Sequence, residues 1–256
     1  MHRKTFIKLS SAFATAPLLS PLSDFAGQAR LQNWAGNLTF STNNVFYPKT
    51  VSEVQSLVKK TDKLRGLGTR HCFNDIADSK YNLISSNSLN NILSLDTVNK
   101  TVTVEGGIKY GELAPYLDKK GFALHNLASL PHISVAGSIT TATHGSGVKN
   151  GNLSTQVRAL EIVIADGSII KLSKEKDGDL FNGAVVGLGA LGFITQLTLS
   201  VEPKYTMRQQ VFVKLPLDQM KDHFVKVIDM SGIPCNDGAQ MAAPRIMHIL
   251  RASTDG

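Results

Sequence analysis

The sequence predicts an α+β fold, and three observations support that prediction. Residues 51–63 carry apolar side chains three and four positions apart, which is the spacing of one helix face. Several short segments, such as residues 101–105, alternate polar and apolar side chains and are rich in β-branched residues, as strands are. The pair Asp166-Gly167 lies between two such segments, which is a strong signal for an antiparallel hairpin.

In the first half of the chain, a strand, a helix and a glycine-containing loop are expected in that order. Residues 45–49 form a strand-like segment that ends at Pro48, and Thr50 or Ser52 is suited to cap the following helix. Residues 63–65 then link this helix to a pair of glycines. Further elements are expected in this order: strands over residues 81–85, 92–95 and 101–105, a helix over 110–121, and a strand segment over 123–125.

In the second half, a strand over residues 157–165 turns through the Asp-Gly pair into a strand over 169–172. A short helix is expected over residues 179–185 and an alternating strand over 193–201. One more strand and one more helix are expected over residues 209–215 and 218–229. From residue 231 onward there is no aromatic side chain, and glycine and proline interrupt any period. This degenerate tail is expected to reflect a truncated or frame-shifted reading or a domain fragment, and the alternative is a genuine short variant.

Residues 187–192, Gly-Leu-Gly-Ala-Leu-Gly, match the pattern Gly-x-Gly-x-x-Gly literally. In a Rossmann site this pattern follows a strand and opens a helix. Here a helix is expected before it and a strand after it. We therefore reject a Rossmann site for a nicotinamide cofactor.

The composition is that of an ordinary globular protein, with 42% hydrophobic and 18% charged residues among 256. The chain is long enough for one large domain or two small ones. Residues 1–30 carry +3 of the net charge of +7, and the other basic residues are scattered without a dense block. We therefore expect no nucleic-acid partner. The two cysteines, Cys72 and Cys235, form no metal-binding spacing, so no metal site is expected.

The first 30 residues have the features of an export signal. They begin with Arg3, Lys4 and Lys8, continue with a mildly apolar stretch over residues 9–22, and reach small residues at 26–29. The apolar stretch is too short and too interrupted for stable insertion into a membrane. The alternative is an uncleaved, frayed terminus of a cytoplasmic protein.

Two runs are the candidates for a ligand site. The first, residues 66–74, reads Gly-Leu-Gly-Thr-Arg-His-Cys-Phe-Asn, and glycines two apart let backbone N–H groups approach an anion. The second, residues 129–147, has no Asp, Glu, Lys or Arg and is dense in small hydroxyl residues. Such a run suits a buried loop whose donors face a large polar ligand.

Together with Asp-Ile-Ala-Asp-Ser at residues 75–79, these two runs resemble the PCMH-type FAD-binding domain of the vanillyl-alcohol-oxidase flavoprotein superfamily. The alditol (xylitol) oxidases are the nearest branch and the aldonolactone oxidases are slightly further away. The resemblance implies an FAD-binding domain of two α/β lobes over residues 35–205, preceded by the export signal over 1–30. Residues 206–256 then correspond to the start of a truncated substrate domain. The N-terminal Arg-Lys-x-Phe-Ile-Lys is similar to the twin-arginine export motif, with lysine at the second arginine, which implies a periplasmic or exported protein.

The resemblance also implies roles for individual residues. FAD is the implied cofactor, bonded covalently to His71, because a neutral imidazole nitrogen is a nucleophile near neutral pH. Arg70 is implied as a pyrophosphate or loop partner, and Cys72 stands where relatives usually carry serine. Ser129 is implied to meet both flavin and substrate, whereas His125 and His132 receive no role. The cofactor-binding residues implied in full are Gly66, Leu67, Gly68, Thr69, Arg70, His71, Cys72, Ser129, Ser134, Gly137, Ser138, Thr141, His144, Gly145, Ser146 and Ile194.

The implied reaction is oxidation of a polyol such as xylitol or sorbitol, with dioxygen reduced to hydrogen peroxide. In the resembled enzymes the residues that orient the polyol lie in the C-terminal half, and no stretch here matches them, so no catalytic residue is assigned. The alternatives are an aldonolactone oxidase and a non-catalytic flavin-binding module. A branch of NADPH-using peptidoglycan-precursor reductases shares the domain type but lacks a covalent histidine in this loop, so His71 argues against it.

Overall fold

The computed structural model describes residues 30–145 and 150–206. The expected export signal, residue Ser146, and the elements expected beyond residue 206 lie outside these residues. In the described ranges, none of the helices has the length and apolar character needed to cross a bilayer.

One lobe is built on a three-stranded parallel sheet in the order β1-β3-β2, formed by β1 (Val45–Phe46), β2 (Leu64–Leu67) and β3 (Asn82–Ser85). Helix α2 (Val51–Lys60) connects β1 to β2 and buries Val54 in a small core with Ile84. Thr50 caps this helix by accepting from the N–H of Glu53 at 3.2 Å, one of the two caps expected from the sequence.

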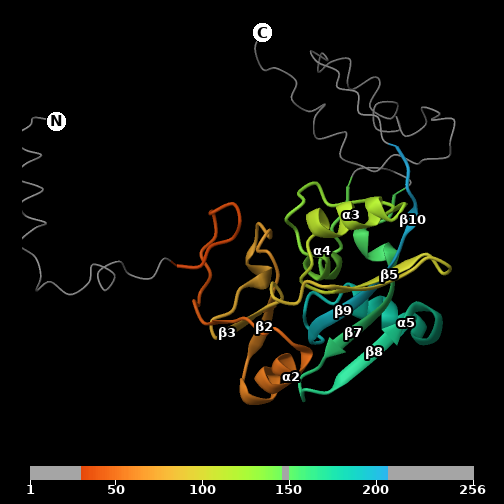
Figure 1. Cartoon of the computed structure of the whole chain (residues 1–256). Coiled ribbons are helices and arrows are strands. Elements are labelled where there is room, and N and C mark those ends of the chain that lie inside the picture. Colours follow the sequence, from red (N-terminus) through yellow and green to blue (C-terminus); the bar gives the residue numbers. More distant parts are fainter. Residues whose placement is uncertain (1–29, 146–149, 207–256) are drawn as a thin grey trace, which may run out of the picture. The chain divides into compact units, whose positions relative to one another are not determined.

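The other lobe is a five-stranded antiparallel sheet in the order β4-β5-β9-β7-β8 (Figure 1). Its strands are β4 (Ile92–Asp96), β5 (Thr101–Glu105), β7 (Val157–Val163), β8 (Ile169–Ser173) and β9 (Phe193–Ser200). Helices α3 (Tyr110–Lys119), α4 (Val135–Thr140) and α5 (Lys174–Val185) contribute to its main core, which includes Leu113, Leu117, Ile139, Phe181 and Leu197. A short antiparallel pair, β6 (Phe122–Ala123) with β10 (Glu202–Pro203), completes the sheets of the described chain. Short 3₁₀ turns lie at η2 (Asp75–Ala77) and η3 (Leu153–Gln156).

The predicted α+β class and the two lobes are confirmed, and the differences lie at element boundaries. The first helix ends at Lys60 instead of residue 63, because residues 64–67 pair with β3 as a parallel strand. Of the residues expected to be a link, Lys63 stays outside the strand, whereas Leu64 and Arg65 form strand β2 together with Gly66 and Leu67, and the ligand loop starts at Gly68. The helix expected over 179–185 begins earlier, at Lys174, and is kinked at Gly178, whose φ is 45°.

The hydroxyl-rich run over residues 129–147 was expected to be a loop, but six of its residues form helix α4. The carbonyls of Ile108 and Gly106 accept from the N–H groups of Val135 and Ala136 at 2.9 and 3.0 Å. These bonds dock the start of the helix onto the turn that follows β5. The glycine-rich residues 187–192 lie between α5 and β9, the element order expected for them and the reverse of the strand-then-helix order of a Rossmann site.

Candidate cofactor site

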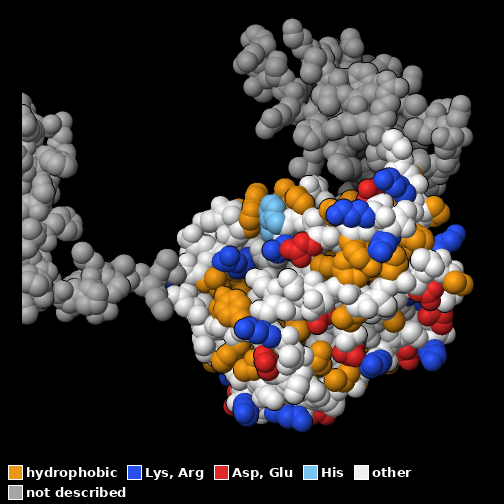
Figure 2. All heavy atoms as spheres, in the orientation of Figure 1, with side chains coloured by type: hydrophobic (Ala, Val, Ile, Leu, Met, Phe, Trp, Pro, Cys, Tyr) orange, Lys and Arg blue, Asp and Glu red, His pale blue; other side chains and the backbone are white. Residues whose placement is uncertain are grey.

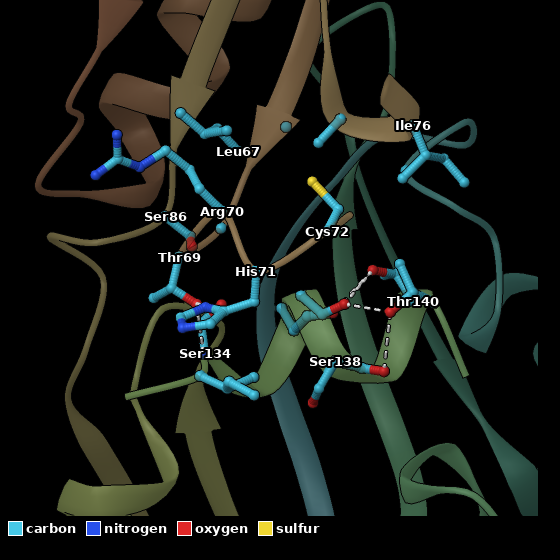
Figure 3. Close-up of a pocket in the computed structure, with 18 of the residues that line it drawn as sticks. Leu67, Thr69, Arg70, His71, Cys72, Ile76, Ser86, Ser134, Ser138 and Thr140 are labelled. Carbon is cyan, nitrogen blue, oxygen red and sulfur yellow. Dashed lines mark hydrogen bonds between the residues drawn. The ribbon is translucent and has the colours of Figure 1, made fainter. Parts of the chain in front are cut away.

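A cavity of about 600 Å³ lies between the two lobes, within the size range of small-molecule sites. Three segments form most of its lining: the end of β2 with the loop that follows, the segment containing α4, and the glycine-rich turn that leads into β9. Figure 3 shows the first two segments facing each other. On the face drawn in Figure 2, Lys and Arg side chains are interspersed with Asp and Glu.

The loop after β2 approaches α4 so closely that Gly68 has room for no side chain. A Cβ on Gly68 would lie 2.8 Å from Ser134 Oγ and 3.6 Å from the Cα of Gly137. A Cβ on Gly137 would also lie 2.8 Å from the same hydroxyl. The two glycines therefore let loop and helix meet around one serine, which is the close backbone approach for which glycine is suited.

The backbone N–H groups of this loop are unpaired. Among the described residues, the N–H groups of the five residues from Gly68 to Cys72 have no hydrogen-bond partner. Arg70 in their midst has φ 63°, in the left-handed region that non-glycine residues rarely adopt. Turns that contain such a residue gather successive N–H groups into a concave site for an anion.

The His71 ring turns toward the start of α4 (Figure 3), and its two nitrogens differ. Nδ1 lies 2.9 Å from Thr69 Oγ1, whereas Nε2 is buried without a hydrogen-bond partner among the described residues. Burial lowers the pKa of the His71 imidazole below its ordinary value, and positive charge on His132 and Arg70 lowers it further. The structure therefore favours a neutral imidazole at this position.

Arg70 lines the cavity, but its guanidinium extends away from α4 (Figure 3). Its Nη1 donates to the backbone carbonyl of Gln32 at 2.8 Å. Of the two roles expected for Arg70, this contact corresponds to the loop partner.

The hydroxyls of α4 are mostly engaged within the protein. Ser138 Oγ donates to the carbonyl of Val135 at 2.8 Å and lies 2.9 Å from Tyr110 Oη. Thr140 and Thr141 donate back to carbonyls three or four residues earlier, as hydroxyl residues in helices do. Ser134 differs, because its Oγ is fully buried and has no partner among the described residues.

The third wall is the glycine-rich turn. Leu188, with φ 51°, donates from its N–H to the carbonyl of Thr140 at 3.2 Å and accepts from Arg65 Nη2 at 3.3 Å. Gly192 has φ 151°, and a Cβ there would lie 2.3 Å from the carbonyl oxygen of Val163. The turn is thus fixed against both other walls before the chain enters β9 at Phe193.

Most of the residues expected at the cofactor lie in this cavity. Ser129, His144 and Gly145 do not line it and are exposed, so the structure does not bring them to the others. Those that do line it are Gly66, Leu67, Gly68, Thr69, Arg70, His71, Cys72, Ser134, Gly137, Ser138, Thr141 and Ile194.

Two residues near the site were not expected there. Ser86, directly after β3, lines the cavity, and its buried Oγ has no partner in the described chain. His132, which received no role, lies with its ring centroid 4.6 Å from that of His71. The position of Ser86 just past the end of a buried parallel strand was an available signal, because ligands bind at the carboxyl ends of such strands. Among the described residues, no cluster of three or more His, Cys, Asp or Glu is placed to hold a metal ion.

Comparison with known proteins shows the family to which this chain belongs. The model of the family described as FAD binding domain matches residues 42–173, which include the loop after β2 and α4. The chain is 45% identical over 188 residues to an alditol oxidase of Streptomyces sp., covering 72% of this chain and 45% of that protein.

Lactone oxidases are also similar. The chain is 35% identical over 204 residues to L-gulonolactone oxidase of Mus musculus, covering 77% of this chain and 46% of that protein. It is 33% identical over 184 residues to D-arabinono-1,4-lactone oxidase of Yarrowia lipolytica, covering 69% and 35%. The chain thus spans less than half the length of these relatives.

Proposed function

The chain belongs to the FAD binding domain family, and from that premise we propose that it is the flavin-binding part of an FAD-dependent alditol oxidase. The alditol oxidase of Streptomyces sp., at 45% identity, supports this choice over the lactone oxidases, at 33–35%. Bound FAD supplies the redox chemistry, taking a hydride from an alcohol carbon and passing the electrons to dioxygen to give hydrogen peroxide.

The single observation that carries the proposal is the set of unpaired polar groups facing one cavity. The unpaired N–H groups of the loop after β2 suit the pyrophosphate of FAD, because they present donors to an anion without a competing side chain at Gly68. The buried hydroxyls of Ser134 and Ser86 add two further groups without partners. Leaving a buried polar group unpaired costs about 1–3 kcal/mol, so three such groups at one cavity, the two hydroxyls and His71 Nε2, are consistent with a polar ligand that pairs them.

For His71 we propose covalent attachment of the flavin: an N–C bond would form between the imidazole and a methyl carbon of the flavin ring as that carbon loses a hydrogen and the imidazole its N–H proton, and the two electrons released would pass to dioxygen, giving hydrogen peroxide. The ring lines the cavity, its Nε2 is buried without a partner in the described chain, and its lowered pKa favours the neutral, nucleophilic form. We assign no residue of the described chain to proton abstraction from substrate. The proposed substrates are alditols such as xylitol or sorbitol.

The second candidate is oxidation of an aldonolactone, favoured by the similarity to L-gulonolactone oxidase. The two share the same cofactor site, so only the substrate separates them. A third possibility, a flavin-binding module without turnover, shares the site too.

The proposal is tested by titrating the purified 256-residue protein with FAD and then assaying peroxide release. We expect saturable quenching of flavin fluorescence, and any peroxide should form with xylitol or sorbitol in preference to gulono-1,4-lactone. Peroxide with the lactone alone would establish the second candidate. FAD binding without turnover is expected equally of a flavin-binding part and of the third candidate. Failure to bind FAD would contradict the proposal as a whole.

A further inference from the structure

Three aromatic rings, from three separate segments, form a cluster around the proposed attachment residue. The Trp34 ring stacks on His71 with centroids 5.4 Å apart and planes at 26°. The His132 ring lies 4.6 Å from His71 and 5.5 Å from Trp34. All three spacings are those of contacting aromatic pairs. His71 is therefore held from two sides by rings that the proposed function does not use.

Trp34 is held in this position by bonds to the flavin loop itself. The backbone N–H of Trp34 donates to the backbone carbonyl of Arg70 at 2.7 Å, and the Arg70 guanidinium donates to the carbonyl of Gln32 at 2.8 Å. The side-chain amide of Asn33 donates to the carbonyl of Cys72, also at 2.8 Å. Residues 32–34 are thus attached to the residues on both sides of His71. These contacts of Arg70 with residues 32 and 34 offer a structural explanation for its left-handed backbone conformation.

The contacts also bear on which nitrogen of His71 carries the lone pair. Thr69 Oγ1 accepts from the N–H of Ser134 at 3.1 Å and lies 2.9 Å from His71 Nδ1. Because a hydroxyl oxygen accepts two hydrogen bonds, a neutral ring that donates from Nδ1 to Thr69 keeps its lone pair on Nε2, the nitrogen without a partner among the described residues. Because the ring is stacked on Trp34, rotation that would exchange the two nitrogens is opposed.

The charged and titratable groups acting on His71 are few. His132 comes from the turn before α4, and Arg70 is its neighbour in the loop. The N-terminal segment contributes the uncharged ring of Trp34, and the contacts from the loop and from the start of α4 are the hydroxyl of Thr69 and the backbone of Ser134. After burial, charge on His132 is the next cause of the lowered pKa of His71, so a proton on His132 disfavours a proton on His71.

We propose that Trp34 and His132 are positioning residues that hold the His71 imidazole in one orientation and one neutral tautomer, ready to form a bond to flavin. This inference rests on the proposed covalent attachment, but the state of the His71 ring can be measured without flavin. Neither residue needs to contact the reacting atoms for this role.

The experiment compares the full-length wild type with Trp34→Ala, Trp34→Phe and His132→Gln. His125→Gln is the matched control, because His125 has its own contact, Nδ1 to Glu202 Oε1 at 3.1 Å, and is not part of the ring cluster. Two properties are measured in each protein: the ring-nitrogen NMR signals of His71 against pH, and the rate at which added FAD becomes resistant to denaturation. Reversible FAD affinity and circular dichroism report binding and folding separately.

We expect Trp34→Ala to slow covalent attachment at least ~tenfold, with reversible affinity nearly unchanged, because a misoriented nucleophile loses rate before affinity. Trp34→Phe should restore most of the rate. In His132→Gln the midpoint of the His71 titration should rise, and the pH below which attachment slows should rise with it. His125→Gln should behave as wild type.

Wild-type rates and an unchanged His71 titration in both Trp34→Ala and His132→Gln would overturn the inference. If Trp34→Ala does not fold, Trp34→Phe and His132→Gln decide by the same readouts. If the wild type binds FAD but never attaches it, the covalent proposal fails, and the NMR measurements alone then decide whether the cluster controls the ring. An unchanged titration in His132→Gln would overturn the inference in that case.

Discussion

The loop after β2 and helix α4 face each other across the cavity, and their polar groups are in opposite states. In the loop, the N–H groups of residues 68–72 and the Nε2 of His71 have no partners in the described chain. In the helix, the hydroxyls of Ser138, Thr140 and Thr141 are all bonded to the protein. The difference indicates that the loop is built to bind a ligand, whereas most of the helix is built to support the loop. Ser134, at the start of the helix, resembles the loop, because its Oγ has no partner among the described residues.

The largest effect is expected where the two walls touch. Gly68→Ala introduces a Cβ 2.8 Å from the buried Ser134 Oγ and forces the loop away from the helix. We expect the free energy of unfolding to fall by about 1–3 kcal/mol and FAD affinity to fall about a hundredfold, since overpacked sites must shift. Fluorescence titration with FAD and denaturant unfolding measure the two effects.

Gly183→Ala in α5 is the matched control, because nothing lies within 4 Å of its Cβ position. Alanine there should leave FAD affinity unchanged and stabilise the helix by about 0.4–1 kcal/mol. Equal FAD binding by Gly68→Ala and Gly183→Ala would contradict the close contact between loop and helix.

The next largest effect concerns the pH dependence of stability and arises at Tyr110, which contacts Ser138 of helix α4. Burial raises the pKa of Tyr110 from 10.0 to about 12, against the opposing effect of its hydrogen bond with Ser138. A folded-state pKa above the unfolded value means that the contribution to stability is complete below pH 10 and is lost as pH rises toward 12. We expect a loss of ~2 kcal/mol across this window. Denaturant unfolding at several pH values measures it.

Tyr110→Phe provides the control for this pH dependence. The variant should show a smaller loss of stability over the same range, because the group that titrates has been removed. A phenol difference spectrum in which every tyrosine of the folded protein ionises near pH 10 would contradict the assignment.

The smallest effects separate two serines of the same wall. Ser138→Ala leaves the buried Tyr110 hydroxyl without its serine partner, so we expect a loss of about 1–2 kcal/mol of stability with little change in FAD affinity. Ser134→Ala removes a hydroxyl that has no partner among the described residues, so we expect unchanged or slightly increased stability and about tenfold weaker FAD binding. Ser138→Ala should therefore lower stability and spare FAD affinity, whereas Ser134→Ala should lower FAD affinity and spare stability. The same pattern in both would contradict the division between ligand-facing and supporting hydroxyls.

The sequence predicted the elements that depend on local signals. The helix cap at Thr50, strand β5 over Thr101–Glu105, and the strand that follows the glycine-rich turn all appear as expected. The end of the first helix was wrong, because the pairing of residues 64–67 with β3 is a tertiary contact that no local pattern encodes. Helix α4 was missed for a related reason: β-branched and hydroxyl residues have weak helix propensity, and the helix is docked by carbonyls of residues 106 and 108.

The site residues, too, were predicted where a local sequence signal marks them and missed where only tertiary contacts define them. The loop around His71 was found because glycines and a resembled motif mark it, and residues 68–72 do line the cavity. Hydroxyl content did not distinguish Ser134, which is unpaired, from Ser138 and Thr141, which are bonded within the protein. The contact of Trp34 and His132 with His71 was out of reach, because it joins three segments that only the fold brings together.

The most direct test of the central claim, that the loop after β2 anchors the flavin through His71, is acid precipitation of the purified, FAD-loaded protein. We expect a yellow pellet for the wild type, and for His71→Ala a colourless pellet under a yellow supernatant. A yellow pellet from His71→Ala would place the bond on another residue. A yellow supernatant from the wild type would contradict covalent attachment, and a protein that takes up no FAD would contradict the role of the loop itself.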